Sequence, residues 1–169
     1  RRRELGENYD GLVELVQNEK ERLVESSSAS AFERILLLSE IGRRGNEMFS
    51  SSDLKQVGAI RERGMAYVVH WILNQSVPSE KAIVWSHNLH IAKSTFQMPD
   101  LVEGELEPLG VLLAKEYGDA YLAIGGAFGK GAFRADLPPG ERVFEAVSPE
   151  TLDGALAATG VPRFLVDLR

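Results

Sequence analysis

The chain has 169 residues, of which 44% are hydrophobic and 26% charged, a composition typical of one globular domain. Its net charge of −6 argues against nucleic-acid binding, which needs a basic surface. No apolar run reaches the length of a membrane span, so we expect no membrane partner. The absence of cysteine excludes disulfides and thiolate metal sites, which fits a cytoplasmic location.

The first part of the chain is predicted to be helical. Apolar residues recur at helical spacing over residues 11–24, 31–48 and 54–74. The chain begins with Arg1 to Arg3, without a methionine or a signal-peptide pattern, so we expect a piece of a longer protein. We divide it into a helical region, 1–77, and an α/β portion, 78–169, within one domain.

The pattern changes after Pro78. Apolar runs of strand length then alternate with helical segments. A helix is predicted over 109–117, with Gly118 as its stop, and another between Ser148 and Gly160. The predicted strands cover 82–85, 120–124, 142–147 and 164–168. This alternation predicts a three-layer α/β/α fold with a mostly parallel sheet.

Two of the three histidines follow the first predicted strand. His87 and His90 are three positions apart, so a helical turn brings both imidazoles to one side. Ligands of open α/β sheets bind just beyond the carboxyl ends of strands. The two rings can therefore share one water as base and acid, bind a zinc ion with a third ligand, or simply pack and cap the helix.

Other candidate functional residues and motifs give weaker sequence signals. Arg61 shares a helical stripe with Met65 and Val68, and an inward arginine needs a carboxylate, phosphate or carbonyl partner. The glycine-rich loop 125–131 lacks the Gly-Lys-Ser/Thr ending of a phosphate-binding loop. A Gly-x-Ser-x-Gly nucleophile element is also missing, which leaves a serine-hydrolase interpretation without its nucleophile.

Several of these motifs together resemble the erythromycin esterase family. Trp85-Ser-His-Asn-Leu-His90 is similar to the family's Trp-Ala-His-Asn-x-His signature. Arg61-Glu-x-x-Met-Ala66 resembles its Arg-Asp/Glu-x-x-Met-Ala helix. The segments Gly118–Gly125 and Phe128–Ala135 resemble the next strand and glycine loop. The resemblance covers about residues 55 to 169.

The resemblance implies a hydrolase that acts on a small-molecule ester, in the founding case the lactone of a macrolide antibiotic, although many members do not act on macrolides. It makes His87 and His90 catalytic residues, with Arg61, Asn88 and Arg134 as substrate-binding candidates. Asn88 is also suited to fixing the turn after the strand. The implied role is bacterial macrolide resistance. A metal is not clearly required, and we expect no cofactor.

Two departures from the family pattern matter. The family's Gly-Glu-x-x-His-Gly element, which carries its presumed general base, is absent, and Val68 stands where asparagine is frequent. Two further interpretations therefore remain open. The chain is a non-catalytic module that binds a metal or haem, or it is an inert part of a larger domain.

Overall fold

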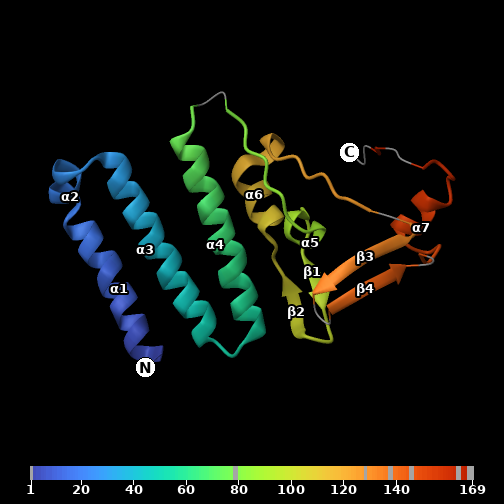
Figure 1. Cartoon of the computed structure of the whole chain (residues 1–169), viewed down its shortest axis with the longest axis horizontal. Helices are drawn as coiled ribbons and strands as arrows, with labels where there is room; N and C mark the ends of the chain where they lie inside the picture. Colours follow the sequence, from blue (N-terminus) through green and yellow to red (C-terminus); the bar gives the residue numbers. More distant parts are fainter. Residues whose placement is uncertain are drawn as a thin grey trace. The chain divides into compact units, whose positions relative to one another are not determined.

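The computed structural model describes residues 2–77, 80–127, 129–136, 139–144, 147–162 and 165–166. Contacts divide the chain into two compact units, Arg1–Ile124 and Gly125–Arg169 (Figure 1). The division by contacts therefore falls after Ile124, whereas the change in sequence pattern lies near Pro78. Within the described residues, no helix combines the length and the apolar character needed to cross a membrane.

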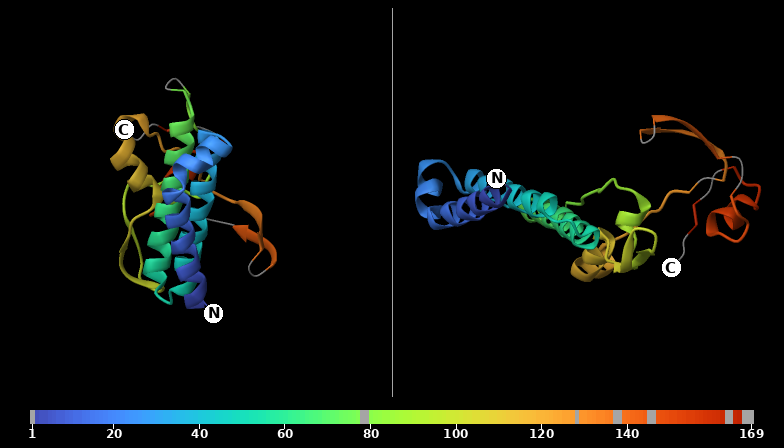
Figure 2. Two further views of the ribbon diagram at one scale, coloured as in Figure 1. Left: turned by 90° about the vertical axis from the view of Figure 1, so that its left-hand side faces the viewer. Right: turned by 90° about the horizontal axis from the view of Figure 1, so that it is seen from below.

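The first unit is built mainly from helices that follow one another in a row, as Figure 1 and the right-hand panel of Figure 2 show. Helix α3 contacts α1 and α4, and α4 contacts α6. The helices predicted over 31–48, 54–74 and 109–117 are confirmed, and the one predicted over 11–24 is divided at Glu19. The helices are α1 (Arg2–Asn18), α2 (Lys20–Ser26), α3 (Ala29–Ser50), α4 (Leu54–Gln75), α5 (Asn88–Ile91) and α6 (Leu109–Tyr117).

Local chemistry explains where the long helices begin and end. The Ser28 side chain accepts a hydrogen bond from the amide of Ala31 at the start of α3, and Asp53 accepts one from Lys55 at the start of α4. Gly118 follows α6 with a φ of 52° and opens the 3₁₀ turn Gly118–Ala120. A side chain would be strained there, so the glycine allows α6 to stop.

The core lies between these helices. Apolar side chains from α1, α3, α4 and α6 bury at least nine-tenths of their surface: Val13, Val16, Phe32, Leu37, Ile60, Leu109, Val111 and Leu113. Leu109 is 1% exposed, so the start of α6 is among the most deeply buried parts of the unit. This burial fixes α6 against α4, the helix that carries the candidate residue Arg61.

In the part of the chain that the structure describes, the strands form two small antiparallel hairpins. In the first unit, β1 (Phe96–Met98) pairs with β2 (Val102–Leu106), which contacts α4. In the second unit, β3 (Gly131–Asp136) pairs with β4 (Pro139–Phe144), and α7 (Leu152–Ala157) follows.

The predicted three-layer α/β/α fold with a mostly parallel sheet is therefore wrong for this structure. Residues 82–85 and 121–124 have no regular secondary structure, and Ile83, Trp85 and Ile124 are 94%, 98% and 66% exposed. Apolar composition favours an extended chain, but a strand forms only where a neighbouring backbone supplies hydrogen bonds. In the described residues the strands pair only as local hairpins.

The remaining elements of the second unit also differ from expectation. Residues 142–144 do form a strand, but as the antiparallel partner of β3. Thr151, not Ser148, caps the last helix, and it accepts a hydrogen bond from the amide of Gly154. Residues 165–166 have no regular structure. The rest of the strand predicted over 164–168, and residues 145–146, lie outside the described residues.

Candidate functional site

The short helix α5 carries both predicted catalytic histidines. His87 caps it, and its Nδ1 accepts a hydrogen bond from the amide of Leu89 at 3.2 Å. Tyr121 and helix α6 help to hold the C-terminal end of α5. The Tyr121 hydroxyl donates to the carbonyl oxygen of Ile91 at 2.8 Å, and burial raises the pKa of Tyr121, which keeps that donor protonated. Helix α6 approaches so closely that a Cβ at Gly110 would collide with the Ile91 carbonyl.

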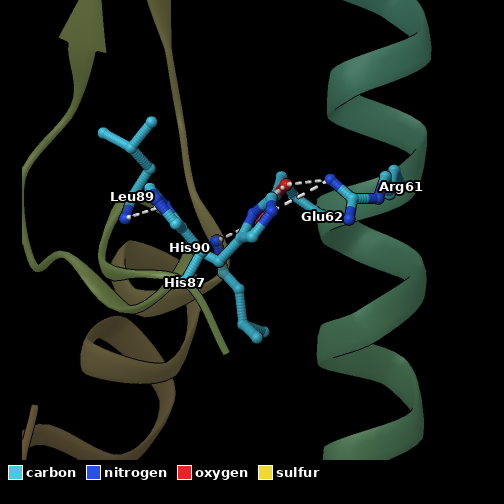
Figure 3. A network of polar contacts seen from close by, with 6 residues as sticks. Arg61, Glu62, His87, Leu89 and His90 are labelled. Atoms are coloured by element: carbon cyan, nitrogen blue, oxygen red, sulfur yellow. Dashed lines mark hydrogen bonds and ion pairs between the residues drawn. The ribbon is translucent and has the colours of Figure 1, made fainter. Parts of the chain in front are cut away.

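His90 lies at the end of α5 and reaches α4 (Figure 3). Its Nδ1 is 2.7 Å from Oε1 of Glu62, and its Nε2 is 3.0 Å from Nη1 of Arg61. Because a guanidinium only donates hydrogen bonds, Nε2 must accept, and the imidazole proton therefore lies on Nδ1. The carboxylate of Glu62 accepts that proton. This arrangement fixes one tautomer of a neutral imidazole, with its lone pair on Nε2.

Glu62 is a buried carboxylate with a fixed position. Its side chain is 11% exposed, and its second oxygen, Oε2, accepts a hydrogen bond from the amide of Leu109 at 2.8 Å. That amide belongs to the first turn of α6, where backbone N–H groups lack helical partners and the helix dipole favours a negative charge. The start of α6 thus anchors Glu62, and Glu62 orients His90.

The two imidazoles do not converge on a common point. Figure 3 shows the ring of His87 turned back to the backbone of Leu89 and the ring of His90 turned toward Glu62 and Arg61. A single water shared by both rings, as the three-residue spacing suggests, does not fit this geometry. Because Nδ1 of His87 accepts a hydrogen bond, its neutral ring carries the proton on Nε2 and can donate it to another group.

A cavity of about 410 Å³ opens beside this cluster. Its wall comes from α3, α4, Leu109 and the extended segment 84–86, and Arg61 forms part of it. The guanidinium of Arg61 is thus shared between the cavity and the Glu62–His90 pair. A mostly apolar pocket with a few converging polar groups is the usual form of a small-molecule site.

The comparison with protein families agrees with these motifs. The sequence model of the erythromycin esterase family matches residues 3–169. The chain belongs to the erythromycin esterase family. Membership supports a hydrolase-type function in general. Neither the curated proteins nor the solved structures gave a match.

Within this erythromycin esterase family member, the predicted site residues have different surroundings. Arg61 and His90 are in contact, and His87 caps the helix that His90 ends. Asn88 is the first residue of α5 and is exposed. Arg134 lies on β3 of the second unit and is exposed. The substrate contacts of Asn88 and Arg134 remain predictions.

Glu62 is a residue of this candidate site that the sequence analysis missed. It follows Arg61 directly and looks like one of a run of surface charges. The available signal was its spacing, because Met65, Ala66 and Val69 lie three, four and seven positions later on one apolar stripe. A carboxylate in such a stripe needs a buried partner, and an imidazole beyond the next predicted strand was available.

The third histidine, His70, lies further along α4 in a different environment. Its Nδ1 is 3.1 Å from the Tyr117 hydroxyl and its Nε2 is 2.8 Å from the side-chain nitrogen of Asn74. Nδ1 of His70 is 3.8 Å from Oε1 of Glu116, and both side chains are about half exposed. In the described part of the chain, His, Asp and Glu nowhere gather in the groups of three that a metal site needs.

Proposed function

We propose that the chain is a carboxylic ester hydrolase of the erythromycin esterase type, in which Glu62 and His90 activate water. The observation that carries this proposal is the 2.7 Å contact between Glu62 Oε1 and His90 Nδ1. A carboxylate in this position keeps the base nitrogen free of its proton and stabilises the imidazolium that forms when that nitrogen takes one.

The proposed reaction has two steps. Nε2 of His90 takes a proton from water as the water oxygen attacks the ester carbonyl. The tetrahedral oxyanion collapses, the bond to the alkoxy oxygen breaks, and the proton passes from Nε2 to the leaving alkoxide. The products are a carboxylic acid and an alcohol, or a hydroxy acid when the ester is a lactone.

In this proposal, Arg61 contacts Nε2 of His90 in the free site and the carbonyl oxygen of the ester in the complex. In the free site its Nη1 lies 3.0 Å from Nε2, in the position that the water needs. The side chain is 53% exposed, so it has room to turn. When the ester binds, the guanidinium moves to the carbonyl oxygen and stabilises the developing negative charge, which leaves the lone pair of Nε2 available.

His87 acts separately from Glu62 and His90. Its Nε2–H is directed away from the capping contact, and the ring is exposed. It donates a hydrogen bond to an oxygen of the substrate at the rim of the site. Asn88 and Arg134 are proposed as further substrate contacts. The substrate is a neutral small-molecule ester, with a macrolide lactone as one candidate, and the reaction takes place in the cytoplasm.

The test is a comparison of the three histidines. Hydrolysis of p-nitrophenyl acetate and of erythromycin is measured with the whole chain and with His90→Ala, His87→Ala and His70→Ala. We expect His90→Ala to lower kcat/KM by about 10²–10⁴, the usual contribution of a general base. His87→Ala should have a smaller effect and His70→Ala almost none. Unchanged hydrolysis in His90→Ala contradicts the proposal.

A further inference from the structure

The cavity beside Arg61 has the size and composition of a site for an apolar group. Its volume of about 410 Å³ lies within the range of about 300–1,000 Å³ that small-molecule pockets occupy. Most of the wall is aliphatic, with Ile41, Met48, Ile60, Met65, Val68 and Val69. The charged residues that line it are Arg44 and Arg61, so the wall favours a neutral or anionic ligand over a cation.

Two glycines in the middle of helices enlarge this cavity. Gly45 of α3 and Gly64 of α4 both line it. A glycine inside a helix costs about 0.5–1 kcal/mol relative to alanine. A Cβ at Gly45 would meet nothing within 4 Å, and one at Gly64 would meet only Cδ of Arg44, at 3.9 Å. Close packing therefore requires neither glycine.

Gly42 and Gly110 of the same unit show the contrast, whereas Gly11 and Gly58 also have room for a Cβ but do not line the cavity. A Cβ at Gly42, also in α3, would collide with the ring of Tyr9, and a Cβ at Gly110 would collide with the carbonyl oxygens of Ile91 and Ala92. Packing explains those two glycines. At Gly45 and Gly64 the space is left open, and this space belongs to the cavity.

We infer that the cavity binds the hydrocarbon part of the ester substrate and that Gly45 and Gly64 set the length of chain it accepts. This inference rests on the proposed ester hydrolysis, because it places the carbonyl oxygen at Arg61 and the apolar chain between α3 and α4. Arg61 connects the cavity with the proposed base, because it lines the cavity and contacts His90. The preferred substrate is thus an ester with an extended apolar acyl group.

The first experiment measures chain-length preference. We compare kcat/KM for p-nitrophenyl octanoate and p-nitrophenyl acetate in Gly45→Leu, Gly64→Leu and the control Gly11→Leu. Gly11 lies within α1, outside the cavity, and a Cβ there meets nothing within 4 Å. Each leucine in the cavity should lower the octanoate value by about tenfold or more, because even one methylene changes the transition-state free energy by about 1–3 kcal/mol.

In Gly45→Leu and Gly64→Leu, kcat/KM for the acetate ester should fall much less than kcat/KM for the octanoate ester, and Gly11→Leu should change neither ester. Where a leucine variant does not fold, Gly64→Ala and Gly45→Ala give the same comparison with a smaller effect. An equal loss for both esters, or no loss for either, overturns the inference.

The second experiment measures binding without catalysis. Trp85 lines the cavity and is 98% exposed, so octanoate bound there should shift its fluorescence emission to shorter wavelength. The shift should disappear in Gly64→Leu and in Trp85→Phe, which retains Trp71. If no ester is hydrolysed but octanoate still causes this shift, the proposed function fails and the cavity remains a binding site.

The reverse result is equally informative. If His90 is needed for hydrolysis but octanoate causes no shift and chain length has no effect, the cavity inference fails alone. A second copy of the chain over Trp85 would also overturn it, and would appear as a concentration-dependent dimer with emission already shifted before octanoate is added.

Discussion

Helix α4 contributes to two histidine clusters, and their difference separates a candidate base from a surface contact. His90 lies between a carboxylate that is 11% exposed and a guanidinium. His70 contacts two neutral groups, Tyr117 and Asn74, at the surface, and its acidic neighbour is 59% exposed and 3.8 Å away. Both rings have polar partners on both nitrogens. Only His90 is held by a buried charge.

Burial determines how firmly each cluster holds its imidazole in one orientation. An exposed ion pair is screened by water and contributes about 0–1 kcal/mol, whereas a buried carboxylate without its partners is costly. The buried pair therefore orients its imidazole firmly and the surface group does not. Removing the corresponding residue from each cluster should show this difference.

The largest expected effect is on catalysis. Glu62→Gln keeps the shape of the side chain but removes the charge that stabilises imidazolium at His90. We expect kcat/KM for ester hydrolysis to fall by about 10²–10⁴. The matched change Glu116→Gln, beside His70, should leave the rate within about twofold. Equal rates for the two variants would show that Glu62 only supports the fold.

The second effect is on stability. Glu62→Ala leaves the Leu109 amide and the Nδ1–H of His90 without an acceptor, and the amide is buried. We expect the free energy of unfolding in urea to decrease by about 2–4 kcal/mol. Glu116→Ala removes only an exposed charge and should change it by less than about 0.5 kcal/mol. A change of similar size in both variants contradicts the assigned difference in burial.

A smaller effect on catalysis is expected when the guanidinium of Arg61 is replaced. Arg61→Lys retains the positive charge but loses the planar arrangement of donors that contacts Nε2 of His90 in the free site and the carbonyl oxygen once the ester binds. We expect kcat for p-nitrophenyl acetate to fall by about tenfold or more, the usual range for the loss of one oxyanion donor being about 10²–10³. Arg63 is exposed and lies two positions further along the same helix, so Arg63→Lys is the control and should leave kcat unchanged.

The smallest effect concerns the His70 cluster at high pH. Burial, and then the charge of Glu116, raise the pKa of Tyr117 above its ordinary value of 10.0. The folded protein therefore keeps this proton to higher pH than the unfolded chain, so the contribution of Tyr117 to stability decreases as the pH rises past about 10. Urea unfolding between pH 9 and 11 should show a shallower decrease for Tyr117→Phe. A decrease as steep as that of the parent would rule out this contribution.

The sequence predicted the local parts of the molecule well. Helical spacing located α3, α4 and α6, and Gly118 marked where α6 ends. The sheet could not be predicted in the same way. The segment 82–85 has the composition of a buried strand, but whether it becomes one depends on a neighbouring backbone, and composition does not specify that neighbour.

By itself, the sequence determined the helices, the turn at His87 and the motifs of the erythromycin esterase family, because each depends on residues within a few positions of one another. Only the tertiary structure decided which carboxylate orients His90. Arg61 and His90 are 29 positions apart, and Glu62 and Leu109 are 47 apart. These contacts arise because α6 packs against α4 and carries α5 with it, and the hydrophobic burial of Leu109 fixes that packing.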